Sequence, residues 1–99
     1  MKKLKLYILV RNDLSPSYQA VQAGHAVAEF CLRGPSTNWE NGTLIYLTVQ
    51  NEEQLYRWKS RLKRRSIKYA EFREPDIGNE LTAISAVAED KVFKRLQLM

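Results

Sequence analysis

A run of small residues between positions 20 and 30 constrains the fold more than any other part of the sequence. It reads Ala-Val-Gln-Ala-Gly-His-Ala-Val-Ala-Glu-Phe and contains the only histidine of the chain. Side chains this small let a helix lie close against a sheet. We expect Gly24 to mark the closest approach, because glycine inside a helix otherwise costs about 1 kcal/mol relative to alanine. The polar groups that this helix offers for chemistry are Gln22, His25 and Glu29.

Two interpretations of His25 follow from the residues alone. In the first, His25 is a hydrogen-bonded histidine in a tightly packed core helix. In the second, it takes part in a reaction, because imidazole titrates near neutral pH and serves as a general acid or base. Cys31 lies six residues further on, about 240° around a helix of 3.6 residues per turn. The two side chains should therefore point apart, and we expect Cys31 to be a small core residue.

The composition fits a single globular domain, residues 1–99, without a metal. Apolar residues make up 44% and charged residues 27% of the chain, both ordinary values for a globular protein. With one cysteine and one histidine, the chain lacks the residues for an internal disulfide and for a zinc or iron site. We expect no metal and no other cofactor.

No stretch of the sequence is typical of a targeting or membrane segment. The first residues, Met-Lys-Lys, lead into alternating lysine and leucine, which is too short and too charged for a signal peptide. No apolar run approaches the roughly 20 residues that a membrane-spanning helix needs. We expect a soluble, cytoplasmic protein that does not bind membranes.

The net charge of +5 is unevenly distributed. Seven of the twelve residues from 57 to 68 are basic, whereas residues 71–90 hold six acids and one arginine. A basic face attracts polyanions and commonly marks nucleic-acid binding, although such a run also occurs on an ordinary solvated helix. The residues that we assign to nucleic-acid binding are Arg57, Lys59, Arg61, Lys63, Arg64 and Arg65.

Hydrophobic patterning and turn residues predict seven elements. Strands are expected over residues 3–10, 43–49, 66–72 and 81–87, and helices over 16–32, from 51 onward and over 89–98. Helical crossovers imply parallel neighbouring strands, while the short link before residue 81 permits an antiparallel pair. The predicted fold is α/β: a single three-layer domain with a mixed four-stranded sheet flanked by helices, in the order βαβαββα.

Polar residues gather where the predicted strands end. Arg11 and Asp13 follow the first strand, and Glu74 and Asp76 follow the third. Ligands of open α/β sheets bind beyond the carboxyl ends of the strands, which makes these residues candidates for a site. Turn or capping chemistry is the alternative for each aspartate. The sequence shows no glycine-rich phosphate loop and no nucleophile elbow.

Three short motifs resemble those of type 2 peptidyl-tRNA hydrolases. Residues 10–14, Val-Arg-Asn-Asp-Leu, match the V-R-x-D-L strand end of that family. Residues 22–26, Gln-Ala-Gly-His-Ala, match its A-A-Q-x-x-H-A helix at a similar separation. Residues 76–78, Asp-Ile-Gly, resemble the D-A-G that begins its active-site loop. The resemblance covers essentially the whole domain in element order.

The resemblance implies a fold, a reaction and a set of site residues. Members of the family have a mixed four-stranded sheet flanked by helices and cleave the ester between a peptide and the 3′ ribose of tRNA. Carried over by position, the catalytic residues would be His25, Asp76 and Asp13, and the substrate-binding residues Arg11, Tyr18, Gln22 and Thr82. His25 and Asp76 would lie near the reacting bond, and Asp13 and Gln22 would orient groups or water.

The sequence also departs from the family pattern at two positions. Tyr18 stands where the family has its active-site lysine, and Glu80 stands where it has the threonine after D-A-G, the nearest threonine being Thr82. Loss of the lysine removes a cation that could hold a phosphate or polarise an ester carbonyl.

Two classes of function remain. The first is hydrolysis of the ester between a peptide or blocked amino acid and the tRNA 3′ end. The second is a nonenzymatic RNA-binding or protein-interaction module that keeps the hydrolase fold. The expected partner is tRNA or another RNA, and the sequence leaves a homodimer open.

Overall fold

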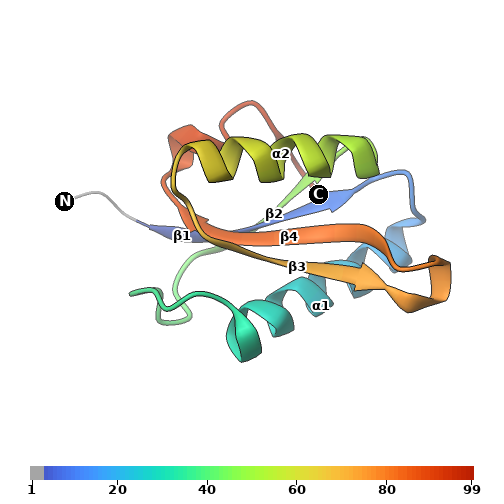
Figure 1. Ribbon diagram of the computed structural model, residues 1–99, viewed down its shortest axis with the longest axis horizontal. Coiled ribbons are helices and arrows are strands. Elements are labelled where there is room, and N and C mark those ends of the chain that lie inside the picture. The colour runs from blue at the N-terminus through green and yellow to red at the C-terminus, as the bar shows by residue number, and fades with distance from the viewer. Residues whose placement is uncertain (1–3) are drawn as a thin grey trace.

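The computed structural model describes residues 4–99 as one α/β domain (Figure 1). Residues 1–3, which include the predicted start of the first strand and the segment judged too charged for a signal peptide, lie outside the described residues. The strands are β1 (Lys5–Arg11), β2 (Leu44–Val49), β3 (Tyr69–Glu74), β4 (Glu80–Ala88) and β5 (Gln97–Leu98). The helices are α1 (Pro16–Arg33) and α2 (Glu52–Arg64), with short 3-10 turns η1 (Pro75–Ile77) and η2 (Asp90–Val92).

The strands form one mixed sheet in the order β3-β4-β1-β2-β5. The pair β1–β2, joined by α1, is parallel, and β4 is antiparallel to both β1 and β3. Helix α1 covers one face of the sheet and α2 the other (Figure 1). The predicted α/β class, the mixed sheet and the three layers are therefore confirmed.

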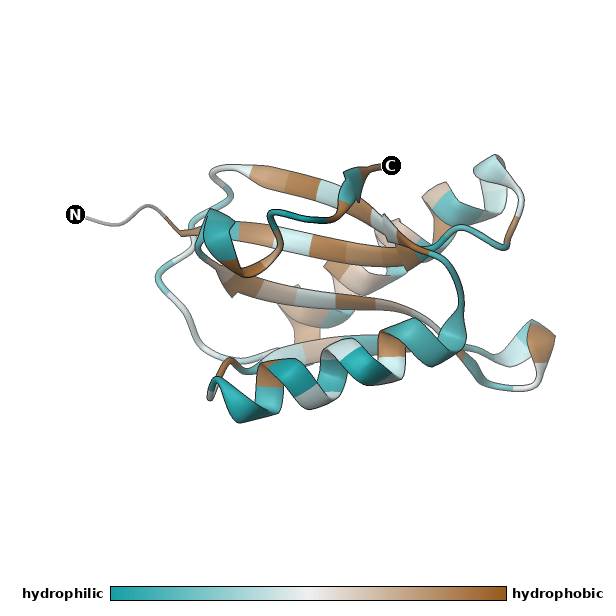
Figure 2. Ribbon diagram, turned by 90° about the horizontal axis from the view of Figure 1, so that it is seen from above, coloured by the Kyte–Doolittle hydropathy of each residue, from teal (hydrophilic) through white to brown (hydrophobic). Residues whose placement is uncertain are grey.

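Strand β1 is apolar on both faces because it lies between the two helices. Leu6, Ile8 and Val10 belong to the core cluster beneath α1, whereas Tyr7 and Leu9 belong to the cluster beneath α2. Strands buried on both faces read as continuous apolar runs rather than as alternating ones. Figure 2 shows hydrophobic residues concentrated in the strands, while α2 is mostly hydrophilic.

Capping residues set both helix starts where the sequence predicts them. The Ser15 side chain accepts from the backbone N–H of Tyr18 at 3.3 Å, and Pro16 begins α1. The Asn51 side chain accepts from the backbone N–H of Gln54 at 3.0 Å at the start of α2. These bonds satisfy backbone donors that the first turn of a helix leaves free.

The predicted helix over residues 89–98 is wrong, and the sheet has five strands instead of four. Only Asp90–Val92 forms a 3-10 turn, after which the chain returns to pair with β2 as β5. Tertiary contacts override the helical pattern, since Asp90 binds Lys5 at 2.8 Å and accepts a hydrogen bond from Tyr7. The predicted inward position of Phe93 is correct, because its ring packs on Tyr7 with centroids 4.8 Å apart.

The third strand begins later than predicted because residues 66–68 complete the end of α2. Ser66 has a φ of 57°, in the left-handed region, and the Ile67 N–H donates to the Leu62 carbonyl. Such bonds satisfy the last carbonyls of a helix. Strand β3 consequently spans Tyr69–Glu74.

The expected close packing of Gly24 on the sheet is also wrong. Gly24 is exposed, and a Cβ at this position would meet no atom of the described residues within 4 Å. Helix α1 packs instead through a face that includes Ala23, Ala26 and Phe30. Cys31, expected in the core, is likewise exposed. In the part of the chain that the structure covers, neither helix combines the length and hydropathy required to cross a bilayer.

Candidate functional site

One face of α1 lies against the carboxyl end of β3. Tyr18, Gln22 and His25 follow at i, i+4 and i+7, a spacing that places them on one side of a helix. The His25 ring stacks on the Phe72 ring with centroids 4.2 Å apart and planes 6° apart. His25 is nevertheless exposed. The interpretation of His25 as a core residue is therefore wrong, and the ring is held flat at the surface.

The Glu74 carboxylate lies at the centre of this face. It is only 7% exposed and accepts a hydrogen bond from Gln22 Nε2 at 2.9 Å and another from the Asp76 backbone N–H at 3.2 Å. These two hydrogen bonds, with a smaller contribution from the charge of His25, hold the pKa of Glu74 below its usual range. Glu74 therefore stays ionised at neutral pH.

The Tyr18 hydroxyl belongs to the same group. Partial burial, followed by the charges of Glu74 and Asp76, raises the pKa of Tyr18 above its usual value. A phenol with a raised pKa remains protonated at neutral pH and keeps its O–H as a donor. The position that the resemblance assigns to a lysine thus holds a neutral hydrogen-bond donor.

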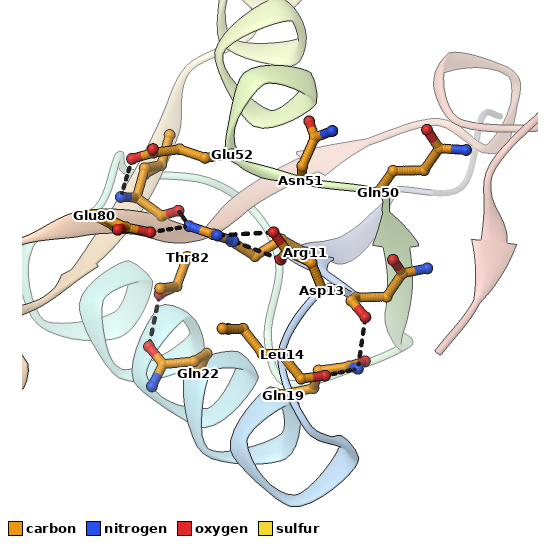
Figure 3. A network of polar contacts seen from close by, with 12 residues as sticks. Arg11, Asp13, Leu14, Gln19, Gln22, Gln50, Asn51, Glu52, Glu80 and Thr82 are labelled. Carbon is orange, nitrogen blue, oxygen red and sulfur yellow. Dashed lines mark hydrogen bonds and ion pairs between the residues drawn. The ribbon is translucent and has the colours of Figure 1, made fainter. Parts of the chain in front are cut away.

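The Glu74 carboxylate is positioned by two fully buried residues, Gln22 and Thr82. Thr82 Oγ1 lies 2.6 Å from Gln22 Oε1 and donates to it (Figure 3). This bond directs the Gln22 amide N–H toward Glu74. Thr82 occupies a β-bulge, because Phe72 pairs with Ala83 whereas Arg73 pairs with Leu81. A bulge re-aims a side chain locally. Since Gln22 and Thr82 are both 0% exposed, the structure supports a positioning role for them.

A second polar cluster surrounds Arg11 at the end of β1. Its guanidinium binds both carboxylate oxygens of Asp13, at 2.7 and 2.8 Å, and Glu80 at 2.7 Å (Figure 3). It also reaches the Leu81 carbonyl at 3.4 Å. The hydrogen bonds from Arg11 lower the pKa of Asp13, and the bond to Asp13 raises that of Arg11. Arg11 and Asp13 are thus engaged with each other.

Further hydrogen bonds fix the loops around this cluster. Glu52, in the first turn of α2, accepts from the Leu81 backbone N–H at 2.8 Å, which ties α2 to β4. Gln19 Nε2 donates to the Leu14 carbonyl at 2.7 Å, which ties α1 to the loop after β1 (Figure 3). The carboxyl ends of β1 and β3 and the beginnings of both helices therefore form one rigid edge.

A tight turn links the two clusters and exposes Asp76. Glu74 and Glu80 are paired residues of β3 and β4, and the chain reverses between them. Gly78 and Asn79 both have left-handed backbone conformations, with φ of 73° and 60°. Their N–H groups donate to the carbonyls of Pro75 and Glu74, and the Asp76 side chain extends from this turn as an exposed group.

The structure thus divides the predicted site residues into two neighbouring sets. Tyr18, Gln22, His25 and Asp76 gather around Glu74. In the other set, Arg11 forms ion pairs with both Asp13 and Glu80. The sequence placed Glu74 at this edge but gave it no role. Its signal was weak, namely a carboxylate directly before the proline that ends β3.

The basic residues assigned to nucleic-acid binding lie on α2 or, in the case of Arg65, at its C-cap. Helix α2 lies across the sheet from α1 (Figure 1). Two of them are already paired with acids: Arg57 with Glu53 at 2.8 Å and Lys59 with Glu71 at 2.7 Å. Within residues 4–99, no group of three or more histidine, cysteine, aspartate or glutamate side chains is arranged to hold a metal ion.

Comparison with solved structures supports the fold. A protein of unknown function from Agrobacterium tumefaciens strain C58 superposes with a TM-score of 0.71 at 13% identity, covering 100% of this chain and 99% of that one. At this identity the likeness concerns the fold alone. No curated protein matches the sequence.

Comparison with protein families identifies the relationship that the motifs suggest. Residues 4–98 match the family described as Peptidyl-tRNA hydrolase PTH2. The match includes the strand end with Asp13, the helix with His25 and the turn with Asp76. Since it spans nearly the whole chain, the protein belongs to the peptidyl-tRNA hydrolase PTH2 family.

Proposed function

We propose that the protein hydrolyses the ester between a peptide or blocked amino acid and the 3′ end of tRNA. The observation that carries this proposal is the surface group on α1, where the exposed His25 ring lies flat on Phe72 beside the ionised Glu74. Family membership supplies the class of substrate. The exposed turn with Asp76 lies next to this group, so the reacting bond would bind between α1 and η1.

In this proposal His25 takes a proton from the attacking water. Its ring is accessible to solvent while Phe72 fixes the plane of the ring, and a positioned imidazole is an effective general base near neutral pH. Glu74 has a pKa too low to compete for the proton, but its charge stabilises the imidazolium that forms. Gln22 and Thr82 hold Glu74 in place.

Asp76 and Tyr18 would contact the substrate. The exposed Asp76 carboxylate can accept a hydrogen bond from the attacking water or from a ribose hydroxyl. The Tyr18 O–H can donate to the ester carbonyl, where negative charge develops in the transition state. Asp13 acts less directly, because both of its oxygens hold Arg11. When the bond between the acyl carbon and the 3′ oxygen breaks, the His25 imidazolium returns its proton to the departing oxygen, so the reaction balances with these groups and water.

One observation favours the nonenzymatic module as a second candidate. The groups that lower the pKa of Glu74 are Gln22, the Asp76 amide, His25 and Tyr18, and none of them is a lysine or arginine. Because Tyr18 is neutral, it cannot compensate the charge of a phosphate as the lysine of the family would. A chain with this site could bind RNA without cleaving it.

Incubation with an N-acetylated aminoacyl-tRNA, followed by measurement of the free tRNA released, distinguishes the two candidates. We expect release by the wild type and a rate lower by roughly 10² to 10⁴ for His25→Ala, the usual effect of a proton-transfer group. Because His25 is exposed, the variant should keep the wild-type melting temperature. Cys31→Ser, an exposed position on the same helix, is the matched control and should retain full activity.

Two results would contradict the proposal. Release by the wild type no faster than in buffer, with binding of the tRNA intact, would favour the nonenzymatic module. A fully active His25→Ala variant would remove His25 from the mechanism.

A further inference from the structure

A basic groove lies between α2 and the C-terminal segment of residues 91–96, on the face of the molecule that carries α2. It encloses about 410 Å³. Its cations come from both walls, and no carboxylate is among the described residues that line it. The cations of this groove are Arg57 and Arg61 of α2, Arg65 at the C-cap of α2, and Lys91, Lys94 and Arg95 of the C-terminal segment.

Most of this charge is not neutralised inside the protein. Two of the six groove cations form ion pairs within residues 4–99. Arg57 pairs with Glu53 at 2.8 Å, and Lys91 pairs with Glu89 at 3.8 Å. The other four groove cations have no acidic partner among the described residues. These are Arg61, Arg65, Lys94 and Arg95.

The floor of the groove is rigid because it is part of the core. Trp58 lies at the floor and packs on Phe93 with ring centroids 5.1 Å apart. The Arg61 guanidinium lies 4.8 Å from the centroid of the Trp58 ring, within the range of a cation–π contact. Phe93 is 2% exposed and fixes the segment that carries Lys94. The contact between Trp58 and Phe93 thus joins the two walls of the groove.

The spacing of the cations suits a ligand with repeating charge. Arg57, Arg61 and Arg65 follow each other at four-residue intervals, about 6 Å of helix axis per step. An adjoining hollow of about 450 Å³ shares Arg61, Arg65 and Arg95 and adds Arg64, which lengthens the basic surface. A row of cations along a concave surface matches the phosphates of a strand better than a single small anion or a flat membrane.

We propose that this groove binds the phosphodiester backbone of RNA. The choice of RNA as the polyanion rests on the proposed function, while the place of binding rests on the groove itself. The sequence assigned RNA binding to α2 alone. The groove adds Lys91, Lys94 and Arg95. It leaves out two residues of the sequence assignment: Lys59, which pairs with Glu71 at 2.7 Å on β3, and Lys63, which lines a different hollow.

The groove is separate from the candidate hydrolytic site. Helices α1 and α2 lie on opposite faces of the sheet, so His25 and Arg61 are separated by the sheet itself (Figure 1). An RNA held in the groove must pass around an edge of the sheet for its end to reach His25. Removal of groove cations should therefore weaken RNA binding without altering the chemistry at His25.

The test is the affinity for a fluorescently labelled, deacylated tRNA, measured by anisotropy over a series of salt concentrations. The groove variant is Arg61→Gln/Lys94→Gln/Arg95→Gln, whose three positions are exposed. The matched control removes the same charge from a different hollow, which Arg33, Lys63 and Lys68 line between the end of α1 and the start of β3. The control is Arg33→Gln/Lys63→Gln/Lys68→Gln.

We expect the groove variant to lose at least about tenfold in affinity at moderate salt and the control less than about twofold. The slope of log affinity against log salt should fall by about two to three for the groove variant, roughly one for each lost phosphate contact. Cys31→Ser, an exposed position on α1 outside the groove, should bind as the wild type does. Deacylated RNA is used, so failure of the proposed hydrolysis would leave this result unaffected.

Three outcomes would overturn the proposal. Equal losses in the two triple variants would show an effect of net charge only. Absence of wild-type binding at low salt would remove RNA as the ligand. Binding to phosphatidylserine vesicles but not to RNA, with the same dependence on Arg61, Lys94 and Arg95, would assign the groove to a membrane surface instead.

Discussion

Removing either of two buried hydroxyl groups on β4 should change the stability of the protein, but in opposite directions. Thr82 and Ser85 lie three residues apart, and both are fully buried. Thr82 Oγ1 donates to Gln22 Oε1 at 2.6 Å, whereas the Ser85 hydroxyl has no hydrogen-bond partner among residues 4–99. Replacing Thr82 by valine keeps the shape of the side chain and removes the donor. Replacing Ser85 by alanine removes an oxygen that contributes no bond.

The expected magnitudes follow from burial. In Thr82→Val the Gln22 carbonyl loses its donor where water cannot reach it, and an unsatisfied buried group costs about 1–3 kcal/mol. For a domain of this size, 1 kcal/mol corresponds to roughly 4–8 °C in melting temperature, so Tm should fall by at least about 4 °C. Ser85→Ala relieves an unsatisfied hydroxyl and should leave Tm unchanged or raise it.

Urea unfolding and thermal melts of the two variants and the wild type measure this difference. Thr82→Val should also lower the hydrolysis rate, since Gln22 then loses the contact that aims its amide at Glu74. The reasoning is refuted if Thr82→Val is as stable as the wild type, or if Ser85→Ala is the more destabilised of the two.

Two further perturbations test the rest of the structure. Gly24→Ala should raise the free energy of unfolding by about 1 kcal/mol, because the position is exposed, helical and open to a Cβ; a lower Tm would show that Gly24 is packed after all. Hydrogen bonds from Arg11 lower the pKa of Asp13 below its ordinary value of 3.8. The stability from this pair is therefore complete above that value and lost as the pH falls through the folded-state pKa. Asp13→Asn should be less stable than the wild type at pH 7, and urea titrations should show the difference narrowing below about pH 4; a constant difference would contradict this.

Local signals predicted the parts of the fold that local chemistry determines. Ser15 with Pro16 and Asn51 with its following glutamates mark helix starts by capping, which depends on neighbouring residues alone. The gathering of Arg11, Asp13 and Asp76 at one edge followed from topology, because parallel strands end together.

Gly24 was misplaced because a helix rich in small residues gives little information on which side is buried. Alanines occur at positions 20, 23, 26 and 28, but only those at 23 and 26 are buried. The buried face is determined instead by Phe30 and by Gln22, a polar residue whose burial depends on Glu74 and Thr82. Those partners lie 52 and 60 positions away in the chain. The periodicity of apolar residues within the helix therefore cannot predict that Gln22 is buried.

The role of Glu74 and the course of the C-terminus depend on tertiary structure in the same way. Gln22 contacts both Glu74 and Thr82, and Thr82 lies at the β-bulge. A single sequence gives no clear signal for a bulge. Residues 89–98 have the spacing of apolar residues that is typical of a helix. Contacts of Asp90 with Lys5 and of Phe93 with Tyr7 instead hold the segment as a 3-10 turn followed by β5. Nothing within the segment itself indicates these partners.

Coupling between His25 and Asp76 tests most directly whether the face of α1 and the turn η1 form one active site. The measurement is the rate of N-acetylaminoacyl-tRNA hydrolysis by His25→Ala, Asp76→Asn and the double variant, each at matched folded fraction. If the two residues act on the same water and ester, the double variant should lose clearly less than the product of the two single losses. Full activity in both single variants, or losses that multiply exactly as for independent sites, would contradict a shared active site.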